Sequence, residues 1–190
     1  MASLLQEAKD VEREIVLVHA EGKNHKIEYH RDEFLREAQT MKLLRELQTI
    51  YPITLDPRKG YLIRNLRLPV DIYTTAVPEQ EVSAALGFCC HLVYMIAKYL
   101  TISLRYRLFC NSSRSAVQLD EATFYPLFMA RSVDREQVDQ GLSLLGDDVN
   151  CILMSHGIQF TPKSHVLARL KRVYDHIIEG ELPLSENGMV

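Results

Sequence analysis

The sequence predicts a mixed α/β (α+β) fold, in which a helical segment precedes a body of short sheets and helices. Three observations predict it. The first 50 residues are rich in Glu, Lys, Arg, Gln and Leu, and Gly22 is the only glycine among them, which favours helix. After Pro52, strand-like segments alternate with segments of helical periodicity. Finally, 47% of the 190 residues are hydrophobic, enough to bury a core.

The predicted helical arm covers residues 1–50 and is expected to be the end of a coiled coil. Apolar residues recur there at three- and four-residue steps between charged ones, a narrow seam typical of pairing with another helix. This predicted seam consists of Phe34, Ala38, Met41, Leu44 and Leu47. Upstream, Ile15 to Val18 fits a helix or a short strand, and Gly22 to His25 interrupts the seam. Pro52 ends the arm.

The predicted α/β body covers residues 51–180, and residues 181–190 are expected to be a flexible tail. The expected strands are Tyr61 to Leu68, a hairpin of Ser103 to Phe109 with Ser115 to Leu119, and Phe124 to Phe128. An apolar helix is expected from about Glu79 to Leu100. A second begins after Asp134 and ends at Gly157, and a third is capped by Thr161, starts at Pro162 and stops at Gly180.

The apolar helix contains Cys89-Cys90-His91, so it could be a membrane span, a metal or thiol site, or only part of the core. Its apolar run, Val82 to Ala97, is shorter than the roughly 20 residues that span a bilayer. Adjacent residues on a helix point about 100° apart, so the three side chains cannot converge on one metal ion. We therefore expect no metal or other cofactor, and interpret the cysteines as small buried hydrophobes.

Other catalytic patterns are weak, and we expect a protein that is not an enzyme. Gly146-Asp147-Asp148 lies inside helical periodicity, so its carboxylates are expected to face solvent. The sequence contains no G-x-S-x-G motif and no glycine-rich phosphate loop. The rival hypothesis is a small enzyme or redox protein that acts through Cys89, Cys90 or His156.

Charge predicts no nucleic-acid partner, because the net charge is only −3. Four cysteines without a disulfide-like spacing, and no secretory signal, indicate a reducing cytosolic compartment.

Residues 61–118 are mildly basic, with six basic and three acidic residues. The candidate membrane contacts are Arg105, Arg107 and Arg114 around the hairpin, with Phe124, Tyr125 and Phe128 nearby. The alternative is that the arginines lie on a solvated strand face or pair with carboxylates of the body, and that at least two of the three aromatics lie in the core.

One long stretch of the sequence, "ALGFCCHLVYMIAKYLTISLRYRLFCNSSRSAV", resembles the C-terminal domain of the UVRAG family. The shared frame is Ala85-Leu86-Gly87, His91-Leu92-Val93, Leu104-Arg105-Tyr106 and Ser113-Arg114-Ser115. "LLRELQTIYPI", "YPLF" and "GLSLLGDDVNCILMSHGI" are similar to further parts of the family, so the resemblance extends from about Leu43 to the last helix.

The resemblance implies a BARA-like fold, short β-sheets each covered by a helix. It also implies a non-catalytic subunit of the class III phosphatidylinositol 3-kinase complex, cytoplasmic and peripheral on endosomal or autophagic membranes. The implied partners are a Beclin-like subunit, met through a coiled coil, and through it the catalytic and pseudokinase-scaffold subunits. The family's lipid-binding C2 domain is not in these 190 residues, so we expect a fragment or a short relative. The autophagy-specific sister subunit and a homodimeric coiled-coil scaffold remain alternatives.

Overall fold

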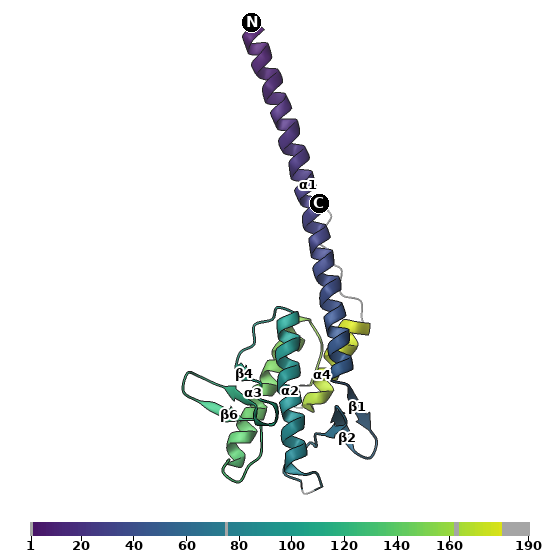
Figure 1. Cartoon of the computed structure of the whole chain (residues 1–190), viewed down its shortest axis with the longest axis vertical. Helices are drawn as coiled ribbons and strands as arrows, with labels where there is room; N and C mark the ends of the chain where they lie inside the picture. The colour runs from purple at the N-terminus through teal and green to yellow at the C-terminus, as the bar shows by residue number, and fades with distance from the viewer. Residues whose placement is uncertain (1, 75, 162–163, 180–190) are drawn as a thin grey trace. The chain divides into compact units, whose positions relative to one another are not determined.

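The computed structural model describes residues 2–74, 76–161 and 164–179, and in the first 24 residues it describes only the side chains of Arg13 and Lys23. The predicted mixed α/β architecture is confirmed, with a long helix followed by short sheets and helices (Figure 1). The elements are α1 (Ala2–Ile50), β1 (Ile53–Asp56), β2 (Gly60–Ile63), β3 (Leu66–Arg67), α2 (Glu79–Tyr99), β4 (Arg107–Phe109), η1 (Ser112–Arg114), β5 (Ala116–Gln118), β6 (Phe124–Pro126), α3 (Arg135–Ser155), α4 (Val166–Tyr174) and η2 (Asp175–Glu179).

The chain divides into two compact units, Met1–Thr40 and Met41–Val190. The first unit is the greater part of α1. The helix is continuous through Ile15 to Val18 and through Gly22, so the alternative of a strand in that region is wrong. From His25 to Thr40 nearly every side chain is exposed, because nothing within this unit covers the helix.

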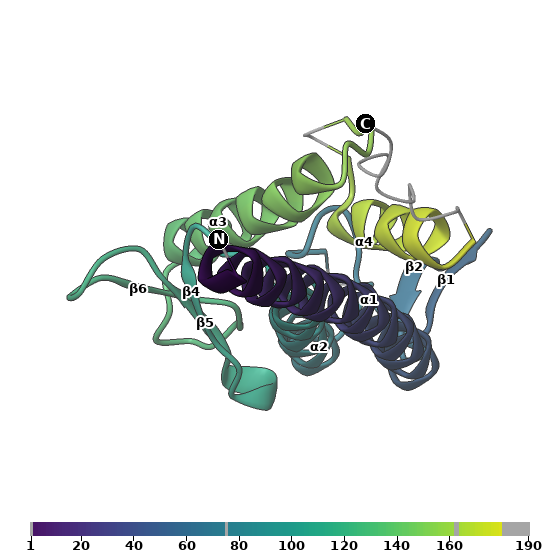
Figure 2. The same ribbon diagram turned by 90° about the horizontal axis from the view of Figure 1, so that it is seen from above.

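The second unit contains two antiparallel three-stranded sheets, ordered β1-β2-β3 and β4-β5-β6. Helix α2 lies between them, with β1 and β2 on one side and β4 and β6 on the other (Figure 1). Helix α3 contacts the second sheet and α4 contacts β2 of the first (Figure 2). Each short sheet is thus accompanied by a helix, and α2 forms the centre of the core.

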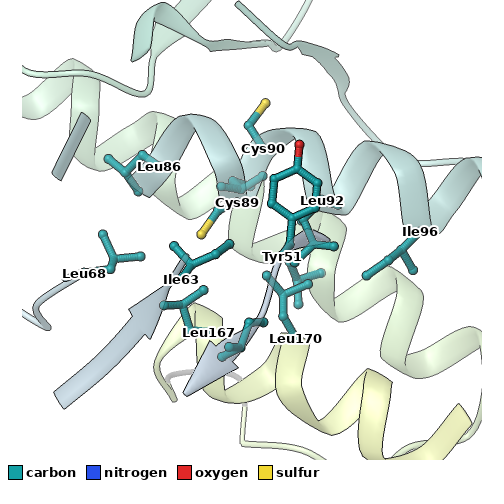
Figure 3. Packing of buried hydrophobic residues seen from close by; sticks show 14 of the residues in the cluster. Tyr51, Ile63, Leu68, Leu86, Cys89, Cys90, Leu92, Ile96, Leu167 and Leu170 are labelled. Atoms are coloured by element: carbon teal, nitrogen blue, oxygen red, sulfur yellow. The ribbon is translucent and has the colours of Figure 1, made fainter. Parts of the chain in front are cut away.

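Burial explains why α2 is the most apolar run of the sequence. It carries 11 buried residues on several faces, including Leu86, Cys89 and Ile96, which have no exposed surface. Leu92 of this helix belongs to one core cluster with Ile63, Leu68, Leu167 and Leu170 from outside it (Figure 3). Fully burying each leucine or isoleucine is worth about 1.5 to 3 kcal/mol, so this cluster supplies much of the stability of the body.

The predicted strand from Tyr61 to Leu68 is in fact a hairpin of β2 and β3. Ile63 pairs with Leu66, and both Arg64 and Asn65 between them have positive φ, as in a two-residue type I′ turn. Strand β1, which the sequence patterns did not indicate, pairs with β2 and completes the first sheet.

The helices α2 and α3 begin and end within a residue or two of their predicted bounds, but α4 does not. It begins at Val166 rather than at Pro162, which lies outside the described residues. His165 is its N-cap: its Nδ1 accepts a hydrogen bond from the backbone N–H of Leu167 at 3.2 Å, and Nε2 lies 2.9 Å from the carbonyl oxygen of Leu68. Nε2 therefore carries the proton, and burial lowers the pKa of the ring.

Candidate interaction surfaces

The predicted seam on α1 divides into exposed and buried residues. Phe34 is 69% exposed and Ala38 is exposed, whereas Met41 is half-buried against the core of the second unit. Leu44 and Leu47, at 1% and 3% exposure, belong to that core. A buried side chain cannot also bind a partner helix, so the seam is corrected to its exposed positions.

Exposure adds one residue to the seam that the sequence reading did not include. Ile27 is 66% exposed and lies seven residues before Phe34, a heptad spacing that places both on the same face of a coiled-coil helix. The signal available in the sequence was the seven-residue spacing from Ile27 to Phe34. The polar residues around the seam include two contacts between a histidine and a glutamate, His25 Nδ1 to Glu28 Oε2 at 3.7 Å and His30 Nδ1 to Glu33 Oε2 at 3.8 Å.

The second sheet carries a cluster of two aromatic rings and one arginine, Arg107, Phe109 and Phe124, which we call the aromatic-basic cluster. The guanidinium carbon of Arg107 lies 5.2 Å from the centroid of the Phe109 ring. The rings of Phe109 and Phe124 meet edge to face with centroids 5.3 Å apart. Phe124 is 49% exposed and Arg107 is exposed, so the cluster presents an apolar ring and a cation to the outside.

The other predicted membrane contacts do not join this cluster. Arg114 and Phe128 line a separate groove of about 560 Å³ beside the first turns of α2. Tyr125 is half-buried on the α3 side of the sheet, where its Cβ lies beside Gly141. Alternation along β6 therefore sends Phe124 outward and Tyr125 toward the core, in line with the period of two in a strand.

Arg105 lies beside Asp148, whose placement corrects a prediction. The sequence pattern predicted a solvent-facing Asp148, but the residue is completely buried on α3. Its Oδ1 accepts hydrogen bonds from the backbone N–H groups of Arg105 and Tyr106 at 2.9 and 3.1 Å. Burial raises the pKa of this carboxyl to about 6, against those two hydrogen bonds, which lower it. Asp148 thus holds the segment that leads into β4.

Two cysteines lie much closer together than their sequence separation suggests. The Sγ atoms of Cys90 on α2 and Cys110 after β4 are 3.7 Å apart. Cys89 is fully buried on the opposite side of α2, and burial raises the pKa of its thiol (Figure 3). Burial of Cys89 agrees with its interpretation as a small hydrophobe. No sequence spacing indicated the pairing of Cys90 with Cys110, because it depends on how β4 packs on α2.

The described ranges contain no group of three or more His, Cys, Asp or Glu side chains placed to hold a metal ion. Helix α2 is long and apolar enough by composition to cross a membrane, yet 61% of its most apolar window is buried inside the protein. Such burial is typical of a core helix.

The fold and its surfaces define a class of protein: a helix with exposed apolar residues, followed by a two-sheet α/β body with an aromatic-basic surface. No protein-family model matches the sequence. Curated proteins that are similar to it include one from mouse and one from fission yeast. The UV radiation resistance-associated protein (UVRAG) of Mus musculus is 30% identical over 142 residues, which cover 71% of this chain and 20% of the mouse protein. The vacuolar protein sorting-associated protein 38 of Schizosaccharomyces pombe is 33% identical over 144 residues, 71% of this chain and 29% of that protein.

These similarities make the chain a member of the UVRAG family, as the sequence resemblance predicted. The chain spans less than a third of the length of either relative.

Proposed function

We propose that this chain is a non-catalytic subunit of a class III phosphatidylinositol 3-kinase complex that acts in endosomal trafficking and autophagy. The observation that carries the proposal is the similarity of 71% of the chain to two relatives named for UV-radiation resistance and for vacuolar protein sorting. The exposed apolar residues of α1 support it, because a subunit of this kind needs a surface for a partner. In this proposal the chain is cytoplasmic and binds endosomal or autophagic membranes peripherally.

The first proposed interface is the exposed seam of α1, formed by Ile27, Phe34 and Ala38. Phe34 leaves most of its ring in solvent, and covering it would gain about 1.5 to 3 kcal/mol. A parallel coiled coil with a Beclin-like subunit covers such a seam, and that subunit connects the chain to the catalytic and pseudokinase-scaffold subunits. The predicted division into an arm of residues 1–50, a body of 51–180 and a tail of 181–190 stays part of this proposal.

The second proposed interface is the aromatic-basic cluster, which would contact anionic lipid. An exposed phenylalanine ring inserts among lipid tails, and an adjacent arginine binds the headgroup phosphates. Phe124 and Arg107 supply this pair through Phe109, which touches both. Arg114 and Phe128 offer a second pairing of the same kind, recessed in their own groove.

Co-purification with a Beclin-like subunit tests the proposed function. Phe34→Asp should reduce the amount recovered at least tenfold, because it places a charge in the seam. Gln39→Asp is the matched control: it introduces the same charge on an exposed residue about 140° further round the helix. Equal recovery of both variants would remove the seam from the proposal. Failure of the unsubstituted chain to bind while it forms a stable homodimer would favour the scaffold alternative.

A further inference from the structure

The contact between Cys90 and Cys110 has the geometry of a reactive thiol pair. Their Sγ atoms are 3.7 Å apart, and a disulfide bond is about 2.05 Å long, so bond formation needs only a small movement. Figure 3 shows the sulfur of Cys90 on the side of α2 away from Cys89. Cys90 is buried and Cys110 is half-buried, so an oxidant reaches Cys110 first.

An open groove makes Cys110 accessible. This groove, of about 680 Å³, lies between α2 and β4, and Cys110 is one of its lining residues. Lys98 and Arg107 line it too, and none of the lining residues is acidic. A positive, partly exposed setting favours the thiolate, which is the reactive form of cysteine. The hydrogen bond from the Cys90 thiol to the Cys110 sulfur lowers the pKa of Cys110, against burial, which raises it.

We propose that Cys110 is a peroxide-sensitive thiol and that Cys90 resolves its oxidised form into an intramolecular disulfide. The Cys110 thiolate attacks one oxygen of a hydroperoxide, forming an S–O bond as the O–O bond breaks, and the released hydroxide takes up a proton to become water. Cys90 then gives up its proton and attacks the sulfenic sulfur as the thiolate; the S–S bond forms as the S–O bond breaks, and the displaced hydroxide takes up a proton to leave as water. Two thiols lose two electrons, and hydrogen peroxide is reduced to two waters.

The two remaining cysteines provide internal comparisons. Cys89, on α2, is fully buried in the core, beyond the reach of the oxidant. Cys151 is half-buried like Cys110, but its sulfur lies 3.8 Å from the carbonyl oxygen of Ser103, a group that cannot resolve a sulfenic acid. Oxidation of Cys110 should thus yield a disulfide, whereas oxidation of Cys151 should not.

The disulfide would tie α2 to β4, the strand that carries Arg107 and Phe109 of the aromatic-basic cluster. Oxidation would then fix the position of that cluster relative to the core helix. This inference depends on the thiols and the groove alone, so it stands whether or not the proposed partner or membrane contacts exist.

The test is peroxide treatment of the reduced full chain, followed by alkylation, trypsin digestion and mass spectrometry. Lys98, Arg105 and Arg107 lie between the two cysteines, so trypsin separates them unless they are joined. The expected product joins the Cys110 peptide to the Cys89-Cys90 peptide, with the loss of two hydrogens. It should persist in Cys89→Ser and Cys151→Ser and disappear in Cys90→Ser and Cys110→Ser. Cys90→Ser should instead accumulate a Cys110 sulfenic acid that dimedone traps.

Two results would overturn the proposal. One is oxidation of Cys151 to an equal or greater extent while Cys90 and Cys110 stay alkylatable as free thiols. The other is a cross-link between different chains, seen as a dimer on a non-reducing gel, in place of the internal one. The first measurement uses the unsubstituted protein, so it decides the question even if a serine variant fails to fold. Circular dichroism of each variant shows which of them are folded.

Discussion

Asp148 on α3 accepts a hydrogen bond from the backbone N–H of Tyr106 at 3.1 Å, although 42 residues separate them in the sequence. The same oxygen accepts the N–H of Arg105. The other oxygen, Oδ2, is buried and has no hydrogen-bond partner in the part of the chain that the structure describes. The segment leading into β4, and with it the aromatic-basic cluster, therefore depends on one buried carboxyl group.

Two substitutions of Asp148 should show how much its acceptor oxygen contributes to stability. Asp148→Ala leaves two N–H groups without their acceptor and should lower the free energy of unfolding by about 1 to 3 kcal/mol. Asp148→Asn keeps an acceptor oxygen, so its loss should be smaller. Urea denaturation at pH 7.4 measures both. Equal decreases in the free energy of unfolding in the two variants would show that the acceptor oxygen does not contribute to stability.

The pH dependence of stability provides a second prediction for Asp148. Its pKa is raised from 3.8 to about 6 in the folded state, so the folded protein holds this proton more tightly than the unfolded one. Its contribution to stability is full below the unfolded pKa and is lost as the pH rises through about 6. The unsubstituted protein should therefore lose stability relative to Asp148→Asn as the pH rises from 4 to 6.5, and the difference between the two should be constant above pH 6.5. A difference that is constant throughout would show an ordinary pKa for Asp148.

Gly87 should not tolerate a side chain. A Cβ atom at this position would overlap the carbonyl oxygen of Ser112, so α2 and η1 would have to separate. Gly87→Ala should therefore cost about 1 to 3 kcal/mol, as overpacking does, even though alanine favours helix. Lys98→Ala, on the exposed part of the same helix, should change stability by less than about 0.5 kcal/mol. Thermal denaturation compares them, and a stabilised Gly87→Ala would contradict the close approach.

Leu44 should matter for folding rather than for binding. It is 1% exposed, so Leu44→Ala should lower the free energy of unfolding by about 2 to 5 kcal/mol. Leu35→Ala, at 53% exposure on the same helix, should have an effect below about 0.5 kcal/mol. Denaturant titration of the chain without any partner provides the comparison. Near-equal stabilities would restore Leu44 to the exposed seam.

Membrane binding should depend on Phe124. Phe124→Asp removes the exposed ring of the aromatic-basic cluster and introduces a charge that anionic lipid repels, so flotation with phosphatidylserine vesicles should fall severalfold. Met154→Asp is the matched control, because Met154 is 70% exposed on α3 and outside the cluster. Unchanged flotation of the Phe124 variant would remove the cluster from the proposed membrane surface.

Periodicity was sufficient to predict the fold class and the helices α2 and α3, because each helix has 21 residues, several times the length of any described strand, with buried residues recurring at three- and four-residue steps. It was less successful with the strands. Strands of two to four residues show no clear alternation, and the turn at Arg64-Asn65 lacks the glycine that usually marks a type I′ hairpin.

The candidate surfaces were predictable only in part. The sequence identified Phe34, Arg107 and Phe124 as exposed candidates, but a helical face does not reveal which turns enter the chain's own core, as Leu44 does. The helical pattern predicted that Asp148 faces solvent. The residue is buried because the segment before β4 packs over it, and the pattern within α3 does not show that contact. Contacts between distant segments, such as Cys90 with Cys110, leave no local signal in the sequence.

The mass of the complex tests the central claim most directly. We expect light scattering of the chain mixed with an equimolar Beclin-like subunit to give the mass of one copy of each, and the Phe34→Asp mixture to give the masses of the separate proteins. The claim is contradicted if the unsubstituted mixture shows only the two separate masses.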